Sequence, residues 1–209
     1  IAGFFQPPPF GTPAETFSIE NCENSGEVIA KAKTANEPAG GILGYIYACD
    51  TEITIHGCTN SGKVDAEGVH DVFDGVGEAG GILGGGRVRM LTITDCINSG
   101  DVTGATYAGG IVGEAEPADA ETESTFLAEN CTNSGTVTSE ADPAGGITAK
   151  ASAGSIVECI NTGAVTSGDA EDYGKLILTA PHRPVVDIEI SCCDAFASDY
   201  VFKAQGTHG

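Results

Sequence analysis

The side chains best able to do chemistry in this 209-residue chain are its eight cysteines, its acidic loops and a few tyrosines. Five of the cysteines open a repeated heptapeptide, C-x-N-[ST]-G-x-V, and they are Cys22, Cys58, Cys96, Cys131 and Cys159. They lie 36, 38, 35 and 28 residues apart, so they form no C-x-x-C pair and a zinc site is not favoured. Because free cysteine packs as a small apolar residue, we expect a buried column of thiols, with disulfides as the alternative.

The asparagines of the same heptapeptide form a second set of equivalent positions. Cysteine, asparagine and valine share parity in the motif, so an extended segment turns all three to the same side. A buried amide must be hydrogen-bonded, and we therefore expect each asparagine to donate to the next one or to the turn backbone. These asparagines are Asn24, Asn60, Asn98, Asn133 and Asn161. The glycines that follow them, Gly26, Gly62, Gly100, Gly135 and Gly163, suit a turn with positive φ.

Acidic side chains gather in two loops, at residues 65–78 and 114–124. Calcium prefers oxygen ligands, and Asp71, Asp74 and Glu78 are the first candidates for a weak Ca²⁺ site. No D-x-[DN]-x-[DN]-G loop accompanies them. We favour the alternative that these carboxylates are solvated, so that no cofactor is expected.

Tyrosines near the recurring GGI segment are the candidates for glycan contact, because exposed aromatic rings on one face favour sugars. They are Tyr45, Tyr47, Tyr107 and Tyr173. Two cysteines outside the motif are also reactive or bridging candidates: Cys49, which falls in no column, and Cys192, which we expect to point away from the side that Cys193 faces.

Composition restricts the function classes. The chain has 30 acidic and 9 basic side chains and a formal charge of -21, which argues against nucleic acid because phosphate contacts need clustered Lys and Arg. No run of about 18 apolar residues is present, so membrane insertion is not expected. A uronate lyase needs basic residues, and only Arg87 and Arg89 form a small basic pair.

A polysaccharide hydrolase is the main alternative to a non-enzyme. Such an enzyme needs two carboxylates that face each other across a cleft. The position five after each repeat cysteine does not form an acidic column, since it reads Glu27, Lys63, Asp101, Thr136 and Ala164. Ice binding is a third possibility, through Thr103, Thr138 and Thr166, but we expect Ala30 and Ala66 in that column. We therefore predict that the chain is not an enzyme.

The elements that position these residues are short strands. Alternating runs such as EITIH at 52–56 precede the cysteines, and AGGILG, AGGILG, AGGIVG and AGGITA recur at 39–44, 79–84, 108–113 and 144–149. The segments are too short for helical repeats, and their period is typical of stacked repeats. We predict an all-β parallel β-solenoid of five to six coils with three short strands per coil. Residues 1–16 form an N-terminal cap, 17–180 the repeats, and 181–209 a last coil, in which Ala195 replaces the asparagine, and a C-terminal cap.

The G-[IL]-[LV]-G core with C-x-N-[ST]-G-x-V between its copies resembles the GLUG-motif repeats of bacterial cell-surface and secreted proteins. The resemblance covers roughly residues 17–180. It implies an adhesin-like module, secreted or at the cell surface, that binds a host, glycan or protein ligand or displays neighbouring domains of a longer chain. The motif also occurs beside the peptidase domain of some secreted immunoglobulin-degrading proteases. The family supplies no catalytic residue for this sequence.

Overall fold

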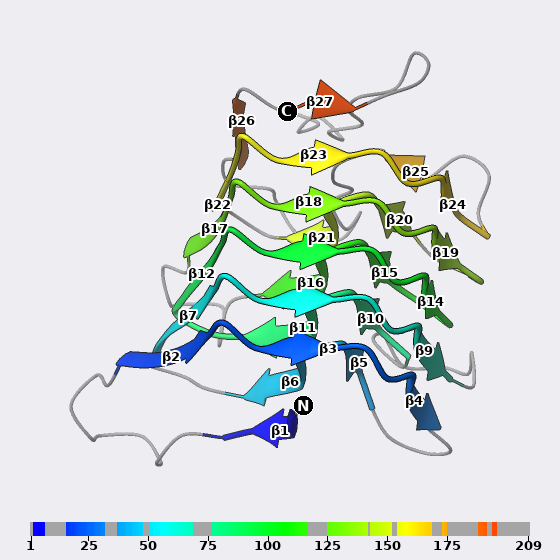
Figure 1. Cartoon of the computed structure of the whole chain (residues 1–209), viewed down its shortest axis with the longest axis horizontal. Coiled ribbons are helices and arrows are strands. Elements are labelled where there is room, and N and C mark those ends of the chain that lie inside the picture. Colours follow the sequence, from blue (N-terminus) through cyan, green and yellow to red (C-terminus); the bar gives the residue numbers. More distant parts are fainter. Residues whose placement is uncertain are drawn as a thin grey trace, which may run out of the picture.

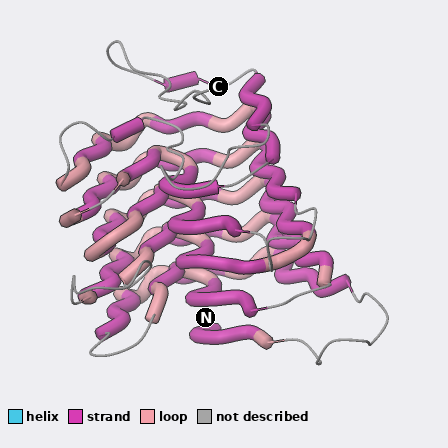
Figure 2. Tube along the Cα trace, turned by 180° about the vertical axis from the view of Figure 1, so that it is seen from behind, coloured by secondary structure: helices cyan, strands magenta, loops and turns pink. Residues whose placement is uncertain are grey.

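The computed structural model describes residues 2–6, 16–31, 37–47, 51–68, 77–116, 125–141, 143–151, 154–168, 173–174, 188–191 and 194–195. In these ranges the chain is all-β and contains no helix, as Figure 2 shows. The strands form five sheets in which every strand pair is parallel and successive repeats lie on top of one another (Figure 1). The protein is therefore a parallel β-solenoid, as the repeat predicts.

Each sheet collects one strand from successive repeats, and we name the sheets A to E. Sheet A contains β1 (Ala2–Phe5), β6 (Leu43–Tyr47), β11 (Leu83–Arg87), β16 (Val112–Glu116) and β21 (Thr148–Ala151). Sheet B contains β2 (Thr16–Glu20), β7 (Glu52–His56), β12 (Met90–Thr94), β17 (Thr125–Glu129), β22 (Gly154–Val157) and β26 (Ile188–Ser191). Sheet C contains β3 (Glu23–Asn24), β8 (Thr59–Asn60), β13 (Ile97–Asn98), β18 (Thr132–Asn133), β23 (Ile160–Asn161) and β27 (Asp194–Ala195).

The two remaining sheets are built from shorter strands. Sheet D contains β4 (Val28–Lys31), β9 (Val64–Glu67), β14 (Val102–Gly104), β19 (Val137–Ser139) and β24 (Val165–Thr166). Sheet E contains β5 (Ala39–Gly40), β10 (Ala79–Gly80), β15 (Ala108–Gly109), β20 (Ala144–Gly145) and β25 (Tyr173–Gly174). A full coil thus runs through sheets B, C, D, E and A.

The expectation of three strands per coil is wrong, because a full coil in the described ranges has five. The two extra strands are the two-residue segments of sheets C and E, which the sequence suggests are turns. An isolated two-residue strand would not persist, but stacking places the equivalent segment of the next coil at the inter-strand spacing of about 4.8 Å. Pairs such as Asn60 with Asn98 and Gly80 with Gly109 are in register for this reason.

The prediction of positive φ at the heptapeptide glycines is also wrong. Each residue directly before a repeat cysteine is left-handed instead, with φ of 51 to 62°: Asn21, Gly57, Asp95, Asn130 and Glu158. Four of the heptapeptide glycines, Gly62, Gly100, Gly135 and Gly163, are instead required by close approach of two backbones. A Cβ built on Gly62 would lie 2.0 Å from the carbonyl oxygen of Gly26, one coil earlier.

The core lies inside the coil and is filled from all five sheets. One cluster joins the inward residues of sheets A and B to the cysteines, and a second joins small side chains of sheets D and E, such as Val64, Val102 and Ala108. Both clusters continue from coil to coil because equivalent positions stack. In the described ranges no helix has the length and hydropathy that a membrane crossing requires.

The ends of the stack refine the expected boundaries. β1 lies within the predicted cap at residues 1–16, yet it extends sheet A by pairing with β6, and Phe4 remains 59% exposed. At the other end, β26 and β27 continue sheets B and C, and Ala195 lies opposite Asn161, as expected for a degenerate repeat. Phe10 and residues 196–209 lie outside the described residues.

Candidate functional site

The repeat asparagines form a continuous ladder of side-chain amides through sheet C. The Nδ2 of Asn60 donates to the Oδ1 of Asn98 at 2.8 Å and to the carbonyl oxygen of Gly62 at 2.8 Å. The same pair of donations recurs at Asn24, Asn98 and Asn133, so all the amides point along the stack in one direction. The Oδ1 of Asn98 also accepts from the backbone N–H of Gly100 at 3.3 Å. The amide nitrogen and the amide oxygen of Asn98 are therefore each hydrogen-bonded to two groups within the fold.

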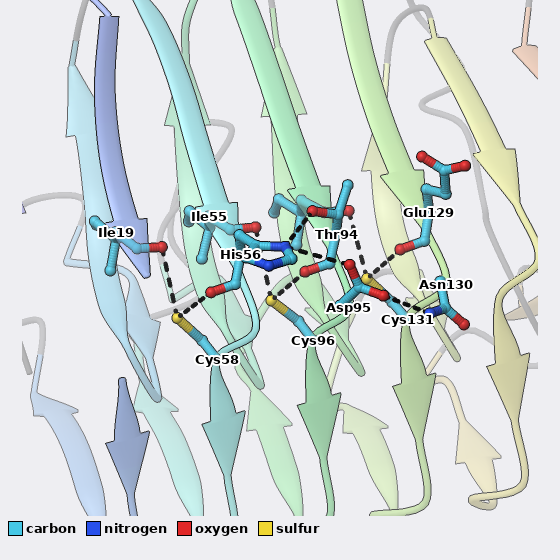
Figure 3. Close-up of polar contacts among 11 residues, drawn as sticks. Ile19, Ile55, His56, Cys58, Thr94, Asp95, Cys96, Glu129, Asn130 and Cys131 are labelled. Carbon is cyan, nitrogen blue, oxygen red and sulfur yellow. Dashed lines mark hydrogen bonds and ion pairs between the residues drawn. The ribbon is translucent and has the colours of Figure 1, made fainter. Parts of the chain in front are cut away.

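The cysteines beside the ladder are free thiols that pack in or against the core, and Figure 3 shows the contacts of three of their sulfur atoms. The Sγ of Cys96 contacts the carbonyl oxygens of Thr94 at 3.3 Å in its own coil and of Ile55 at 3.7 Å in the preceding coil. Cys58, Cys131 and Cys159 repeat this arrangement. Burial raises the pKa of the Cys58 thiol to about 11. Since the thiolate is the reactive form, burial keeps the Cys58 thiol inert at neutral pH.

A polar group at the corner between sheets B and C is exposed (Figure 3). The Nδ1 of His56 lies 2.9 Å from the Oγ1 of Thr94 and 3.2 Å from the Oδ2 of Asp95, and Asp95 accepts from the amide of Asn130. Histidine, carboxylate and hydroxyl are the residue types of a catalytic triad. A triad, however, uses the two ring nitrogens for different partners. Here one nitrogen faces both the hydroxyl and the carboxylate, so the group links neighbouring coils.

A second group lies on the outer side of sheet A, and we call it the sheet A cluster. Its members are Tyr45, Glu78, Arg87, Tyr107, Glu114, Glu116 and Lys150. The inward position of this sheet is occupied by Ile46, Gly86, Ala115 and Ala151. The adjacent, outward position reads Tyr45, Gly85, Glu114 and Lys150 in successive coils.

Lys150 is the centre of the sheet A cluster. Its Nζ lies 2.6 Å from the Oε1 of Glu114, 3.2 Å from the Oε1 of Glu116, and 4.8 Å from the centre of the Tyr107 ring. Glu114 is only 1% exposed and Lys150 9%. Burial works to lower the pKa of Lys150, but the two carboxylates outweigh it and the pKa is raised. The ammonium is therefore held in its charged form between two carboxylates.

Glu78 and Tyr45 form the other half of the cluster. The Glu78 side chain is fully buried, and its Oε2 lies where only a glycine at position 85 leaves room, since a Cβ there would be 2.5 Å from that oxygen. Tyr45 stacks on Phe4, with ring centres 6.1 Å apart. Burial raises the pKa of the Tyr45 hydroxyl to about 12. The cluster thus joins side chains from four successive coils.

The sequence-derived candidates separate into three groups. Tyr45, Tyr107 and Glu78, predicted for two different sites, belong to the sheet A cluster. Tyr107 is only 6% exposed, so the expectation of an exposed sugar-binding ring is wrong there, whereas Tyr47 is 44% exposed. Nothing is described of the side chain of Tyr173, which lies in β25. Asp71, Asp74, Cys49, Cys192 and Cys193 lie outside the described residues.

The position of Glu78 does not support the predicted calcium site. Its carboxylate is buried beside Gly85 instead of lying in a solvated loop. Within the described ranges no three His, Cys, Asp or Glu side chains are grouped so that they could hold a metal ion. Sequence reasoning did not find Lys150, nor the pairing of Glu114 with it. The sequence does contain a signal for this pairing. The sixth residue after the alanine of each AGG segment is Tyr45, Gly85, Glu114 and Lys150 in successive repeats, so Glu114 and Lys150 are equivalent positions.

The threonine column considered for ice binding is also different from expectation. Thr103, Thr138 and Thr166 do stack in sheet D, but Asp65 and Ile29 continue their column. Ala66 lies opposite Gly104, one residue further along the strand. The register is set by the inward valines, and the column position is the residue directly after each valine. An acidic and an aliphatic residue therefore interrupt the hydroxyl array.

The stacked parallel sheets, with asparagine and cysteine columns inside, place the chain in the class of parallel β-solenoids. No protein-family model matches the sequence, and neither a curated protein nor a solved structure matches it.

Proposed function

We propose that this chain is a non-catalytic β-solenoid module of a surface or secreted protein, which binds a ligand in an adhesin-like manner or displays neighbouring domains. One observation carries the proposal: the residue types that recur in every repeat are used for contacts between coils. The asparagines bond to one another, the thiols bond to backbone carbonyls of adjacent coils, and the glycines admit neighbouring backbones. The recurring asparagines, cysteines and glycines therefore serve the stacking of coils.

The outward positions vary from coil to coil. In sheet C the outward column reads Glu23, Thr59, Ile97, Thr132 and Ile160, and Ile97 and Ile160 are 46% and 36% exposed. A regular stack with a variable surface is suited to holding other groups at fixed positions. The resemblance of the motif to GLUG repeats adds a bacterial cell-surface or secreted setting to the proposal.

The charge arrangement of the sheet A cluster argues against the hydrolase alternative. A glycosidase requires one carboxyl of its pair to carry a proton for the leaving group. Such a pair must also be open to the glycosidic bond that lies between its carboxyls, and Glu114 is only 1% exposed. Lys150 contacts both Glu114 and Glu116, so this pair is suited to a structural ion network.

Catalysis is tested by incubating the protein with a panel of neutral and acidic polysaccharides and measuring newly formed reducing ends. We expect release at the rate of the buffer alone. The matched variant is Glu114→Gln, which keeps the shape of the side chain. Reducing-end release that disappears in this variant would overturn the proposal and establish the hydrolase.

Ligand binding is tested on a glycan array with the native protein and the Tyr47→Ala variant. Tyr47 is the exposed ring among the described candidates, and it lies in register with Arg87. If a sugar is bound at this surface, we expect Tyr47→Ala to lose most of the signal. Tyr107→Phe, in which the ring stays buried, is the control that keeps it. Binding that survives Tyr47→Ala would place the ligand elsewhere.

A further inference from the structure

The end of the solenoid at β1 to β5 contains one strand of an otherwise missing coil. At this end β2, β3, β4 and β5 are the terminal strands of sheets B to E, whereas in sheet A the strand of the same coil, β6, is followed outward by β1 (Figure 1). Each coil runs through sheets B, C, D, E and A in that order. β1 therefore occupies the fifth position of a coil whose first four positions hold no strand in the described part of the chain.

The inward side chains at this end are only half-buried. Phe17, Ile19, Cys22, Asn24 and Val28 keep intermediate exposure, whereas their equivalents Ile53, Ile55, Cys58, Asn60 and Val64 are between 0% and 2% exposed. Four of these five pairs have the same residue type, and all five are in register, so their difference in burial reflects the neighbouring coil that this end lacks. The end surface has the chemistry of the solenoid interior.

The hydrogen-bonding groups at this end point in the same directions as their equivalents in the following coils. In the second coil, the N–H of Thr59 donates to the carbonyl oxygen of Cys22 at 2.9 Å, and the N–H of Ser61 donates to that of Asn24 at 2.8 Å. By the same register, the N–H groups of Glu23 and Ser25 point out of the end. The Oδ1 of Asn60 accepts the amide of Asn24, so the Oδ1 of Asn24 is placed to accept an amide from a preceding coil.

Gly26 is the most specific sign of a missing neighbour. Cβ atoms built on Gly62, Gly100, Gly135 and Gly163 would lie 1.9 to 2.0 Å from the carbonyl oxygen of the equivalent glycine one coil earlier. At Gly26 the nearest atom is 3.7 Å away and belongs to Asn24 of its own coil, and φ is not left-handed. In the described structure nothing requires glycine at position 26. A preceding coil would require it.

We propose that this end is a docking surface for one further coil of the same repeat, which continues into β1 and places its own C-x-N-[ST]-G-x-V segment on β3. Its asparagine donates to the Oδ1 of Asn24, and a backbone carbonyl packs on Gly26. A second copy of the chain could dock only through its opposite end, where β27 is the last described strand of sheet C. That end lacks the donating amide, because Ala195 occupies the asparagine position of β27. The occupant is therefore a coil that is covalently continuous with β1.

The test adds such a coil. A copy of residues 51–81 is placed directly before Ile1, so that its final AGG precedes IAGFF as the native AGG precedes ILGYI at 42–46. We expect hydrogen exchange at the amides of Glu23 and Ser25 to slow at least tenfold, toward the rates of Thr59 and Ser61, and the urea midpoint of unfolding to rise. A Gly/Ser segment of the same length is the control and should change neither quantity.

Gly26→Ala separates docking from mere lengthening. The substitution should leave the midpoint of the native chain almost unchanged and should lower the midpoint of the extended chain to that of the Gly/Ser control. An equal effect of Gly26→Ala in both chains would overturn the proposal.

Two measurements on the native chain alone keep the proposal testable if the extended chain does not fold. Glu23 and Ser25 amides that already exchange as slowly as those of Thr59 and Ser61 would show that the end is closed, which contradicts the proposal. Sedimentation that shows head-to-tail oligomers would identify the occupant as a second copy and would also contradict it.

Discussion

At the scale of single residues, the most constrained side chain is the interior repeat asparagine. Asn98 is fully buried and bonds to two other asparagines and to the backbone of Gly100. No donor or acceptor of the Asn98 amide remains for a ligand. The same residue type at the end of the ladder, Asn24, is half-buried and has one asparagine neighbour.

This difference predicts unequal costs of the same substitution. Asn98→Ala leaves several buried donors and acceptors without partners, at about 1 to 3 kcal/mol each, and should lower the free energy of unfolding by roughly 4 kcal/mol. Asn24→Ala should cost about 1 kcal/mol, because water reaches the freed groups. Urea denaturation of both variants measures the difference. Equal costs would show that the amides do not form a cooperative ladder.

The pKa of Tyr45 gives a second prediction at this scale. Its folded-state pKa of about 12 lies above the ordinary value of 10.0 because of burial. A raised folded pKa contributes stability that is present below pH 10 and is lost as the pH rises toward 12. The native protein should therefore lose stability more steeply than Tyr45→Phe between pH 10 and 12. The free energy of unfolding is measured by urea denaturation of both proteins at pH 8 and pH 11. An equal loss in the two proteins would contradict the burial of this hydroxyl.

At the scale of elements, the sequence predicts the strands that alternate and misplaces the turns. The runs before the cysteines become β2, β7, β12, β17, β22 and β26, because alternation of apolar and polar residues is a local property. The two-residue strands of sheets C and E depend on pairing with the equivalent strand of the next coil, so a local pattern does not reveal them. The same reason explains why glycine at position 62 indicated a turn, although it serves contact with Gly26.

The candidate site follows the same division. That the asparagines and cysteines point inward could be predicted, since parity within one heptapeptide decides it. The sheet A cluster could not, because Glu114 and Lys150 are 36 residues apart and meet only when the register of β16 and β21 is known. Aligning the outward positions after each AGG would have placed Tyr45, Gly85, Glu114 and Lys150 in one column.

Glycine substitutions directly after sheet E and within sheet A test the element contacts. A Cβ on Gly81 would lie 2.2 Å from the carbonyl oxygen of Gly110 and 2.3 Å from the Cγ of Asn98, so Gly81→Ala should destabilise the fold by more than about 3 kcal/mol. Gly86→Ala is the control, because the nearest atom is 3.6 Å away, in Ile46. We expect its stability to stay within about 0.5 kcal/mol of native. A tolerated Gly81→Ala would mean that the corner is not packed as described.

At the scale of the whole molecule, the composition now has a structural explanation. Apolar residues and amides are stacked inside the coil, and ion pairs between coils, such as Lys31 with Glu67, lie on its outside. Exposed pairs of this kind contribute little stability individually. Stability therefore comes from stacking, each coil depends on its neighbours, and the end coil is the least buried.

The central claim is that the repeated residues serve stacking and face the interior of a solenoid. Labelling the native protein with N-ethylmaleimide, followed by peptide mass mapping, tests this claim directly. Cys58, Cys96, Cys131 and Cys159 should remain unlabelled free thiols until the protein is unfolded in denaturant, and Cys22, which is half-buried at the open end, should react faster than these four. Rapid labelling of the four buried thiols in the native protein, or disulfides among them, would contradict the account.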